Sequence, residues 1–153
     1  MARSRSFEAP VVTSVKTISS AARDSGLSVW CDAYPYMAGS TYLSQLLPSW
    51  VLEGGIEPMI ARLRSHEARA RIRTELEFEF PGWSSRLKAA GGWHNVMIAN
   101  VGNPELRWAE GLRVAELAQV RDVDPTELIL DLLIQDRGAT GMVTFTMDEA
   151  DGR

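Results

Sequence analysis

The sequence contains one cysteine and two histidines, which is little for a chain of 153 residues. A single cysteine, Cys31, excludes a disulfide within the chain and favours a reducing compartment. His66 and His94 belong to no His-x-His, His-Glu-x-x-His or Cys/His cluster, so their spacing predicts no metal site. Both are interpreted as surface residues. Cys31 lies in an apolar run and is interpreted as a small buried hydrophobe rather than a ligand or nucleophile.

Long apolar runs and a surplus of basic residues are also absent. No run approaches the roughly 20 residues that cross a bilayer, and the arginines of residues 1–6 precede no apolar segment of the kind found in secretory signals. The net charge of -4 argues against nucleic acids and anionic membranes as partners. We therefore expect a cytoplasmic protein, and its apolar fraction of 45% is typical of a globular domain.

Common catalytic and phosphate-binding motifs are missing as well. No Gly-x-Ser-x-Gly occurs, and the glycine pairs at 54–55 and 91–92 lack the lysine and the strand–helix setting of a phosphate loop. The acidic pair Asp148-Glu149 is interpreted as a solvated helix start. The stretch Gly39-Ser40-Thr41 could bind an anion through backbone N–H groups and hydroxyls, and this remains open from the residues alone.

Apolar spacing predicts helices that alternate with strands, which indicates an α/β fold. A helix from Val15 to Ser25, ended by Gly26, leads into a buried strand from Leu27 to Ala33. The remaining predicted elements are a helix over 57–76, a strand over 96–101, a short helix over 112–118, a helix over 125–133 that starts at a proline, and a strand over 142–147. The arginine-rich helix over 57–76 is either a basic patch or a solvated face with Glu/Arg pairs four residues apart, and the second is favoured.

The polar and aromatic stretch that follows the first strand, residues 32–41, is typical of a loop that forms one wall of a substrate pocket. Its sequence, Asp-Ala-Tyr-Pro-Tyr-Met-Ala-Gly-Ser-Thr, resembles the N-acyl-D-amino-acid deacylases (D-aminoacylases) of the metal-dependent amidohydrolase superfamily. The resemblance continues through Leu-Leu-Pro-x-Trp at 46–50 and Glu-Gly-Gly at 53–55. Further agreement lies in the arginines at 62–73, in Gly-Trp-x-Asn-Val-x-Ile at 92–98 and in Gly-Met-Val-x-Phe-x-Met at 141–147. The stretch Glu-Gly-Leu-x-Val-Ala-Glu-Leu-Ala at 110–118 is similar to the family's Glu-Gly-Lys-Ser-Leu-x-Glu-Ile-Ala.

The resemblance implies a TIM-like barrel enzyme that hydrolyses N-acyl-D-amino acids to a carboxylate and a D-amino acid. Zinc-bound water would be the nucleophile and an Asp the general base. The family's metal ligands, a His-x-His pair, a Cys and two further histidines, precede the matched region, and its catalytic Asp follows that region. Cys31 is not at the metal-cysteine position. We therefore expect no catalytic residue and no metal ligand in this chain, with zinc confined to the full-length family.

The resemblance also assigns substrate-binding residues. It implies that Tyr34 and Ser40 contact the substrate, Ser40 at its carboxylate, and that Met147 lines the acyl or side-chain pocket. Thr144 stands where the family often has Tyr, so a phenol donor is missing there. The implied organisation is a barrel helix, strand and substrate loop over 1–47, an inserted helical subdomain over 48–123, and a barrel helix and strand over 124–153.

Two hypotheses of different classes follow. The leading one is an internal fragment of a zinc-dependent deacylase-like amidohydrolase, inactive alone, because a full barrel takes about 250 residues. The alternative is a non-catalytic interaction or oligomerisation module that folds as a homo-oligomer or with a partner. A complementing partner chain that carries the histidines is a third reading.

Overall fold

The computed structural model describes residues 19–30, 38–78 and 83–146. The chain divides into two compact units, Met1–Pro35 and Tyr36–Arg153, which are described separately. In the first unit, residues 19–24 are helical, and Gly26 follows them with a φ of 85°. The N–H of Leu27 donates to the carbonyl of Ala22 at 3.0 Å, as is usual where glycine terminates a helix. The predicted role of Gly26 is confirmed.

The predicted buried strand from Leu27 to Ala33 is wrong over its described part. Residues 27–30 form no strand, and the side chains of Leu27 and Trp30 are 62% and 89% exposed. The carbonyl of Val29 accepts a hydrogen bond from Nε of Arg23 at 3.0 Å instead of joining a ladder. An apolar run becomes a strand only where a neighbour satisfies its backbone, and no described strand pairs with this one. Residues 31–33, including Cys31, lie outside the described residues.

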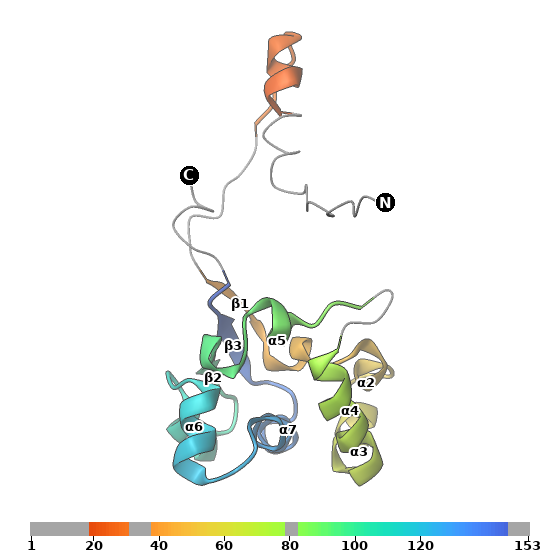
Figure 1. Cartoon of the computed structure of the whole chain (residues 1–153), viewed down its shortest axis with the longest axis vertical. Coiled ribbons are helices and arrows are strands. Elements are labelled where there is room, and N and C mark those ends of the chain that lie inside the picture. The colour runs from red at the N-terminus through yellow and green to blue at the C-terminus, as the bar shows by residue number, and fades with distance from the viewer. Residues whose placement is uncertain (1–18, 31–37, 79–82, 147–153) are drawn as a thin grey trace, which may run out of the picture. The chain divides into compact units, whose positions relative to one another are not determined.

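The second unit contains short helices and a small sheet (Figure 1). Its elements in chain order are β1 (Gly39–Tyr42), η1 (Leu43–Leu46), α2 (Ser49–Leu52), α3 (Ile56–Arg64), α4 (His66–Glu77), α5 (Arg86–Ala89), η2 (Trp93–Asn95), β2 (Val96–Asn100), η3 (Pro104–Ala109), α6 (Val114–Arg121), α7 (Pro125–Gln135) and β3 (Gly141–Thr144). The fold is thus of mixed helix and strand, as the sequence predicts. Strand β1 differs from the sequence prediction, which placed residues 39–41 in a loop.

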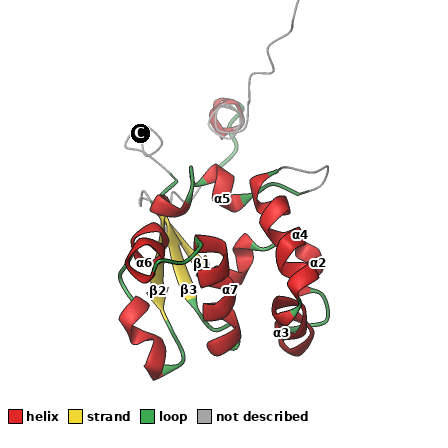
Figure 2. Ribbon diagram, turned by 60° about the horizontal axis from the view of Figure 1, so that its bottom comes forward, coloured by secondary structure: helices red, strands yellow, loops and turns green. Residues whose placement is uncertain are grey.

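The three strands form one sheet in the order β1-β3-β2, and both pairs are antiparallel. Gly39 lies opposite Thr144, and Ser40 lies opposite Val143. The helices α6 and α7 lie in front of the strands in Figure 2, and their side chains share a core with Ile98 and Met142 of the sheet. One face of an antiparallel sheet is commonly covered in this way while the other stays solvated. The described residues show no segment of a parallel barrel.

The core is organised around α7. Asp124 caps this helix, because its Oδ1 accepts the N–H groups of Thr126 at 2.9 Å and Glu127 at 3.1 Å. Pro125 occupies the first turn, as the sequence predicts. The buried residues of α7 are Leu128, Ile129, Leu130, Leu132 and Leu133, besides Thr126. They join one hydrophobic cluster that draws on the stretches 1–47, 48–123 and 124–153, and the division into these three segments stays a prediction.

The single helix predicted over 57–76 is two helices, because the chain is extended at Ser65. The Oγ of Ser65 accepts the N–H of Ala68 at 3.4 Å, and serine is a preferred residue at the start of a helix. The expected pairing four residues apart is present between Arg71 and Glu75 at 2.6 Å. Other arginines of α4 are not simply solvated, and Arg69 in particular reaches across to α7.

Arg69 binds two carboxylates of α7. Its terminal nitrogens lie 2.5 Å from Glu127 and 2.6 Å from Asp131, and its Nε donates to the carbonyl of Leu63 at 2.6 Å. Burial lowers the pKa of Arg69, but the hydrogen bonds that it donates to Asp131 and Glu127, together with their negative charges, outweigh this effect and raise the pKa above its ordinary value. Arg69 therefore stays charged and fastens α4 to α7.

Candidate functional site on the open sheet face

Ser40 is the predicted site residue that the structure describes. It is the second residue of β1, and its side chain is exposed. Its neighbours along the strand, Gly39 and Thr41, are less exposed, which is the alternation of a strand with one solvated face. The hydroxyl of Ser40 is thus accessible to a ligand.

A row of side chains crosses the sheet at Ser40. Ser40 pairs with Val143 of β3, and Val143 pairs with Met97 of β2. Directly paired residues point to the same face of a sheet, so the three side chains lie together. The next row contains Met142 and Ile98, which are 1% and 0% exposed and belong to the core. We call the side that bears Ser40, Tyr42, Met97, Arg113, Val143 and Phe145 the open face.

Arg113 and Phe145 complete the open face. The guanidinium carbon of Arg113 lies 4.0 Å from the centre of the Phe145 ring, and one of its terminal nitrogens donates to the carbonyl of His94 at 2.9 Å. Arg113 also forms an isolated antiparallel bridge with Met97. The N–H of Phe145 donates to the carbonyl of Asn95 at 3.0 Å, which prolongs the ladder beyond β3. The position of Arg113 is therefore fixed by the ring of Phe145, the carbonyl of His94 and the backbone bridge of Arg113 to Met97.

Sequence reasoning missed Arg113 and Phe145, although one signal was available. Arg113 precedes the first residue of α6, a position where Ser, Thr, Asp or Asn is preferred. The acidic partner of a capping box is present, since the N–H of Arg113 donates to Oε2 of Glu116 at 3.2 Å. A residue that breaks a local rule indicates a tertiary or functional reason.

Tyr34 and Met147 lie outside the described residues. Thr144 is half-buried, and its hydroxyl donates to the carbonyl of Gly39 at 3.5 Å. Thr144 therefore links β3 to β1, the strand that carries Ser40. The chain enters β1 and leaves β3 at the same end of the sheet, because Gly39 and Thr144 are paired.

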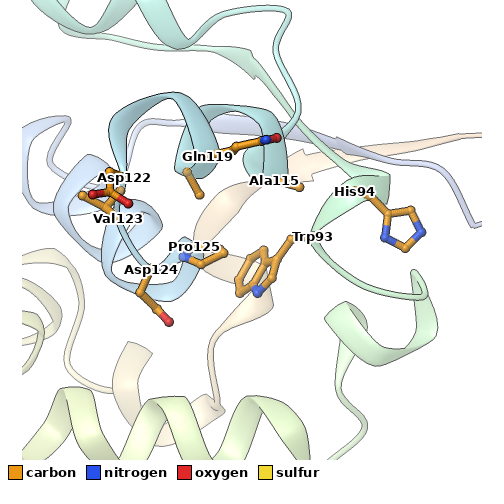
Figure 3. Close-up of a pocket in the computed structure, with 9 residues that line it drawn as sticks. Trp93, His94, Ala115, Gln119, Asp122, Val123, Asp124 and Pro125 are labelled. Carbon is orange, nitrogen blue, oxygen red and sulfur yellow. The ribbon is translucent and has the colours of Figure 1, made fainter.

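A surface pocket of about 650 Å³ lies beside this region, between η2, α6 and the start of α7 (Figure 3). Trp93 points toward Pro125 inside it, whereas the His94 ring is turned away from Trp93. The carboxylate of Asp124 already caps α7. Ser40 is not among the residues that line this pocket. One of its lining residues, His94, contacts the open face through its carbonyl, which accepts a hydrogen bond from Arg113.

The zinc that the resemblance implies has no donor set in the described part of the chain. No group of three or more His, Cys, Asp and Glu residues there could hold a metal ion. His66 and His94 are exposed and lie on different elements, as surface residues would. These residues do not fit a zinc centre, so no chemical step through zinc is derived. Among residues 19–30, 38–78 and 83–146, no helix is long and apolar enough to cross a membrane.

Comparison with known proteins identifies no relative. No protein-family model, no curated protein and no solved structure matches the chain.

Proposed function

We propose that this chain supplies part of the substrate pocket of a zinc-dependent amidohydrolase of the N-acyl-D-amino-acid deacylase type, and that it does not turn over substrate alone. The observation that carries the proposal is the pairing of Gly39 with Thr144. It brings the Gly-Ser-Thr end of the motif, residues 39–41, next to β3. The resemblance assigns a substrate contact to Ser40 in the first of these strands.

In this proposal the inserted subdomain is wider than the expected stretch 48–123 and runs from 39 to 144, because β1 and β3 pair with each other in an antiparallel sheet. A segment whose two ends emerge side by side can be inserted between neighbouring elements of a larger fold without disturbing it. The described part of the second unit has its own core, so it would keep its shape within such a fold. The open face, with the hydroxyl of Ser40 and the side chains of Met97 and Val143, then offers polar and apolar contacts to an acylated amino acid.

The catalytic centre belongs to other residues in this proposal. Zinc would supply an activated water for attack on the amide carbon in the family's chemistry. This chain would hold and orient the substrate, with the hydroxyl of Ser40 donating to the substrate carboxylate. Positioning of this kind contributes to catalysis because it removes orientational freedom from the reacting groups.

The purified chain tests the part of the proposal that concerns activity. We expect no hydrolysis of N-acetyl-D-methionine in the presence of added zinc. Hydrolysis that persists through further purification and is lost in Ser40→Ala would overturn it, since the chain would then contain its own catalytic centre. Ser49→Ala is the matched control, because Ser49 is exposed on α2, outside the sheet.

A second candidate function is favoured by the sheet edge. β1 is an edge strand of the described sheet, and Tyr42 on it is 61% exposed. An exposed edge is a template for pairing with another chain, so a non-catalytic interaction or oligomerisation module is the alternative. Sedimentation equilibrium separates the two: a monomer up to about 100 μM, far above the nanomolar range of stable complexes, argues against the module as a homo-oligomer.

A further inference from the structure

The two edges of the sheet differ, because the described residues cover only one of them. At the outer edge of β2, the N–H of Ile98 donates to the carbonyl of Leu112 at 3.0 Å, and the carbonyl of Ile98 accepts the N–H of Gly111 at 2.8 Å. Met97 of the same strand forms a bridge with Arg113. The segment before α6 thus closes the edge of β2. No described strand pairs with the outer edge of β1.

The ladder between β1 and β3 shows which backbone groups of β1 face outward. The N–H of Leu43 donates to the carbonyl of Thr140 at 2.8 Å, and this pair continues the register of β1 with β3. Hydrogen-bonded and non-hydrogen-bonded pairs alternate along an antiparallel ladder, so the odd-numbered residues of β1 bond to β3. The backbone groups of Ser40 and the N–H of Tyr42 therefore point to the outer edge.

The composition of β1 suits pairing with an identical strand. Charged residues, prolines and bulges usually protect an exposed edge, but β1 contains no charged residue and no proline. The whole stretch 33–52 is uncharged. The chain carries a net charge of -4, yet two copies that meet along this stretch bring no like charges together.

We infer that β1 pairs antiparallel with β1 of a second copy of the chain, about a twofold axis at Ser40. The N–H and the carbonyl of Ser40 then exchange two hydrogen bonds with the same groups of the other copy. This register places a larger side chain opposite a smaller one on both faces, because Thr41 lies opposite Gly39 and Tyr42 lies opposite Ala38. The helix η1 begins directly after Tyr42, so the strand is centred before that residue.

The pairing joins two three-stranded sheets into one. Both outer edges of the joined sheet are those of β2, which the chain itself covers, so the assembly closes at two copies and does not grow into a filament. On the open face, the row of Ser40, Val143 and Met97 continues into the same row of the other copy. The inference is independent of the deacylase proposal. It gives the second candidate function a partner and a register.

Sedimentation equilibrium of the full chain measures the pairing. We expect a dimer with a Kd of about 10 μM, because one short strand buries little surface and small interfaces are the weak ones. The variant Tyr42→Pro should remain a monomer up to about 100 μM. Proline removes the outward N–H, whereas the φ of -70° at Tyr42 already suits it and no bond to β3 is lost. The control Tyr42→Val keeps the N–H and favours strands, so it should change the Kd by less than about threefold.

Cysteine cross-linking tests the register, in a Cys31→Ser background. Hydrogen-bonded residues of antiparallel strands have Cα atoms about 5.5 Å apart, which is within the range of a disulfide. Ser40→Cys should therefore give a disulfide-linked dimer under mild oxidation. Ser49→Cys, at an exposed position on α2, is the matched control and should not. A dimer that Thr41→Cys links more readily than Ser40→Cys would overturn the axis at Ser40.

The outcomes separate this inference from both candidate functions. A chain that stays monomeric at about 100 μM overturns the inference and the second candidate function as a homo-oligomer, while the deacylase proposal is still judged by turnover. A dimer that survives Tyr42→Pro and is not linked by Ser40→Cys also overturns the inference, because the copies then meet elsewhere. If circular dichroism shows that Tyr42→Pro does not fold, the cross-linking result decides alone.

Discussion

Gly39 lies opposite Thr144 on neighbouring antiparallel strands, although 105 positions separate the two residues. The pairing joins β1, which carries Ser40, to β3. Contacts so distant in sequence are costly to form, because the loop between them must first be ordered. The stability of the sheet therefore determines whether the open face exists, and the first prediction concerns the strand at its centre.

Gly141→Ala should destabilise the sheet by about 1–3 kcal/mol, the usual cost of overpacking. A methyl group at Gly141 would collide with Oδ1 of Asn100 and lie 3.0 Å from its Cγ. The free energy of unfolding in urea measures the loss. Asn100→Ala should restore most of it in the double variant, since it removes the obstacle. Gly39→Ala on the same sheet should cost little, because its methyl group would meet only Oγ1 of Thr144 at 3.7 Å.

Arg69→Met should lower the free energy of unfolding by about 1–2 kcal/mol, because it removes hydrogen bonds to two partly exposed carboxylates of α7. Arg64→Met on the exposed side of α3 should change it by less than about 0.5 kcal/mol. An equal effect of the two substitutions would contradict the role of Arg69.

The pKa of Arg69 gives the sign of its pH dependence. Because this pKa is raised in the folded state, the stabilisation is complete below the ordinary arginine pKa and is lost only as the pH rises through the raised value. The difference in unfolding free energy between wild type and Arg69→Met should therefore stay constant from about pH 7 to 9, far below the ordinary arginine pKa. A difference that shrinks steadily as the pH rises over this range would be inconsistent with the raised pKa.

Asp136→Ala should be among the most destabilising substitutions, at about 2–4 kcal/mol, because it leaves two donors without their acceptor. The side chain of Asp136 accepts the N–H of Asn103 at 2.6 Å and the hydroxyl of Thr140 at 2.7 Å, and the residue is 5% exposed. Thermal unfolding followed by circular dichroism measures the change. Asp136→Asn should cost less, since its amide oxygen still accepts one of these bonds. A fully tolerated Asp136→Ala would show that the contacts contribute little.

Local signals predicted several elements well. Gly26 ends its helix, the proline at 125 starts α7, and strands are present at 96–100 and 141–144, where strands were expected over 96–101 and 142–147. These features depend on the backbone chemistry of a few adjacent residues. The split at Ser65 also had a local signal, because serine is a preferred residue at the start of a helix. The apolar stripe on both sides of Ser65 nevertheless favoured one continuous helix in the sequence interpretation.

Features that depend on distant partners were not predictable in the same way. Leu27 to Trp30 has the composition of a buried strand, yet no described strand pairs with it. Ser40 was selected for its motif, while its position on an open face follows from the register with Val143. Arg113 could not be connected with Phe145 from the sequence, because only the fold brings η2, α6 and the end of β3 together.

The central claim is that the stretch from Gly39 to Thr144 is a substrate-binding subdomain of a deacylase. The most direct measurement is the turnover of N-acetyl-D-methionine by an established N-acyl-D-amino-acid deacylase in which residues 39–144 of this chain replace the corresponding stretch. We predict measurable hydrolysis, a KM raised about tenfold or more by Ser40→Ala through loss of a hydrogen bond to a charged group, and no change with Ser49→Ala. A chimera that folds and retains its zinc but shows no hydrolysis, or whose KM is unaffected by Ser40→Ala, would contradict the claim.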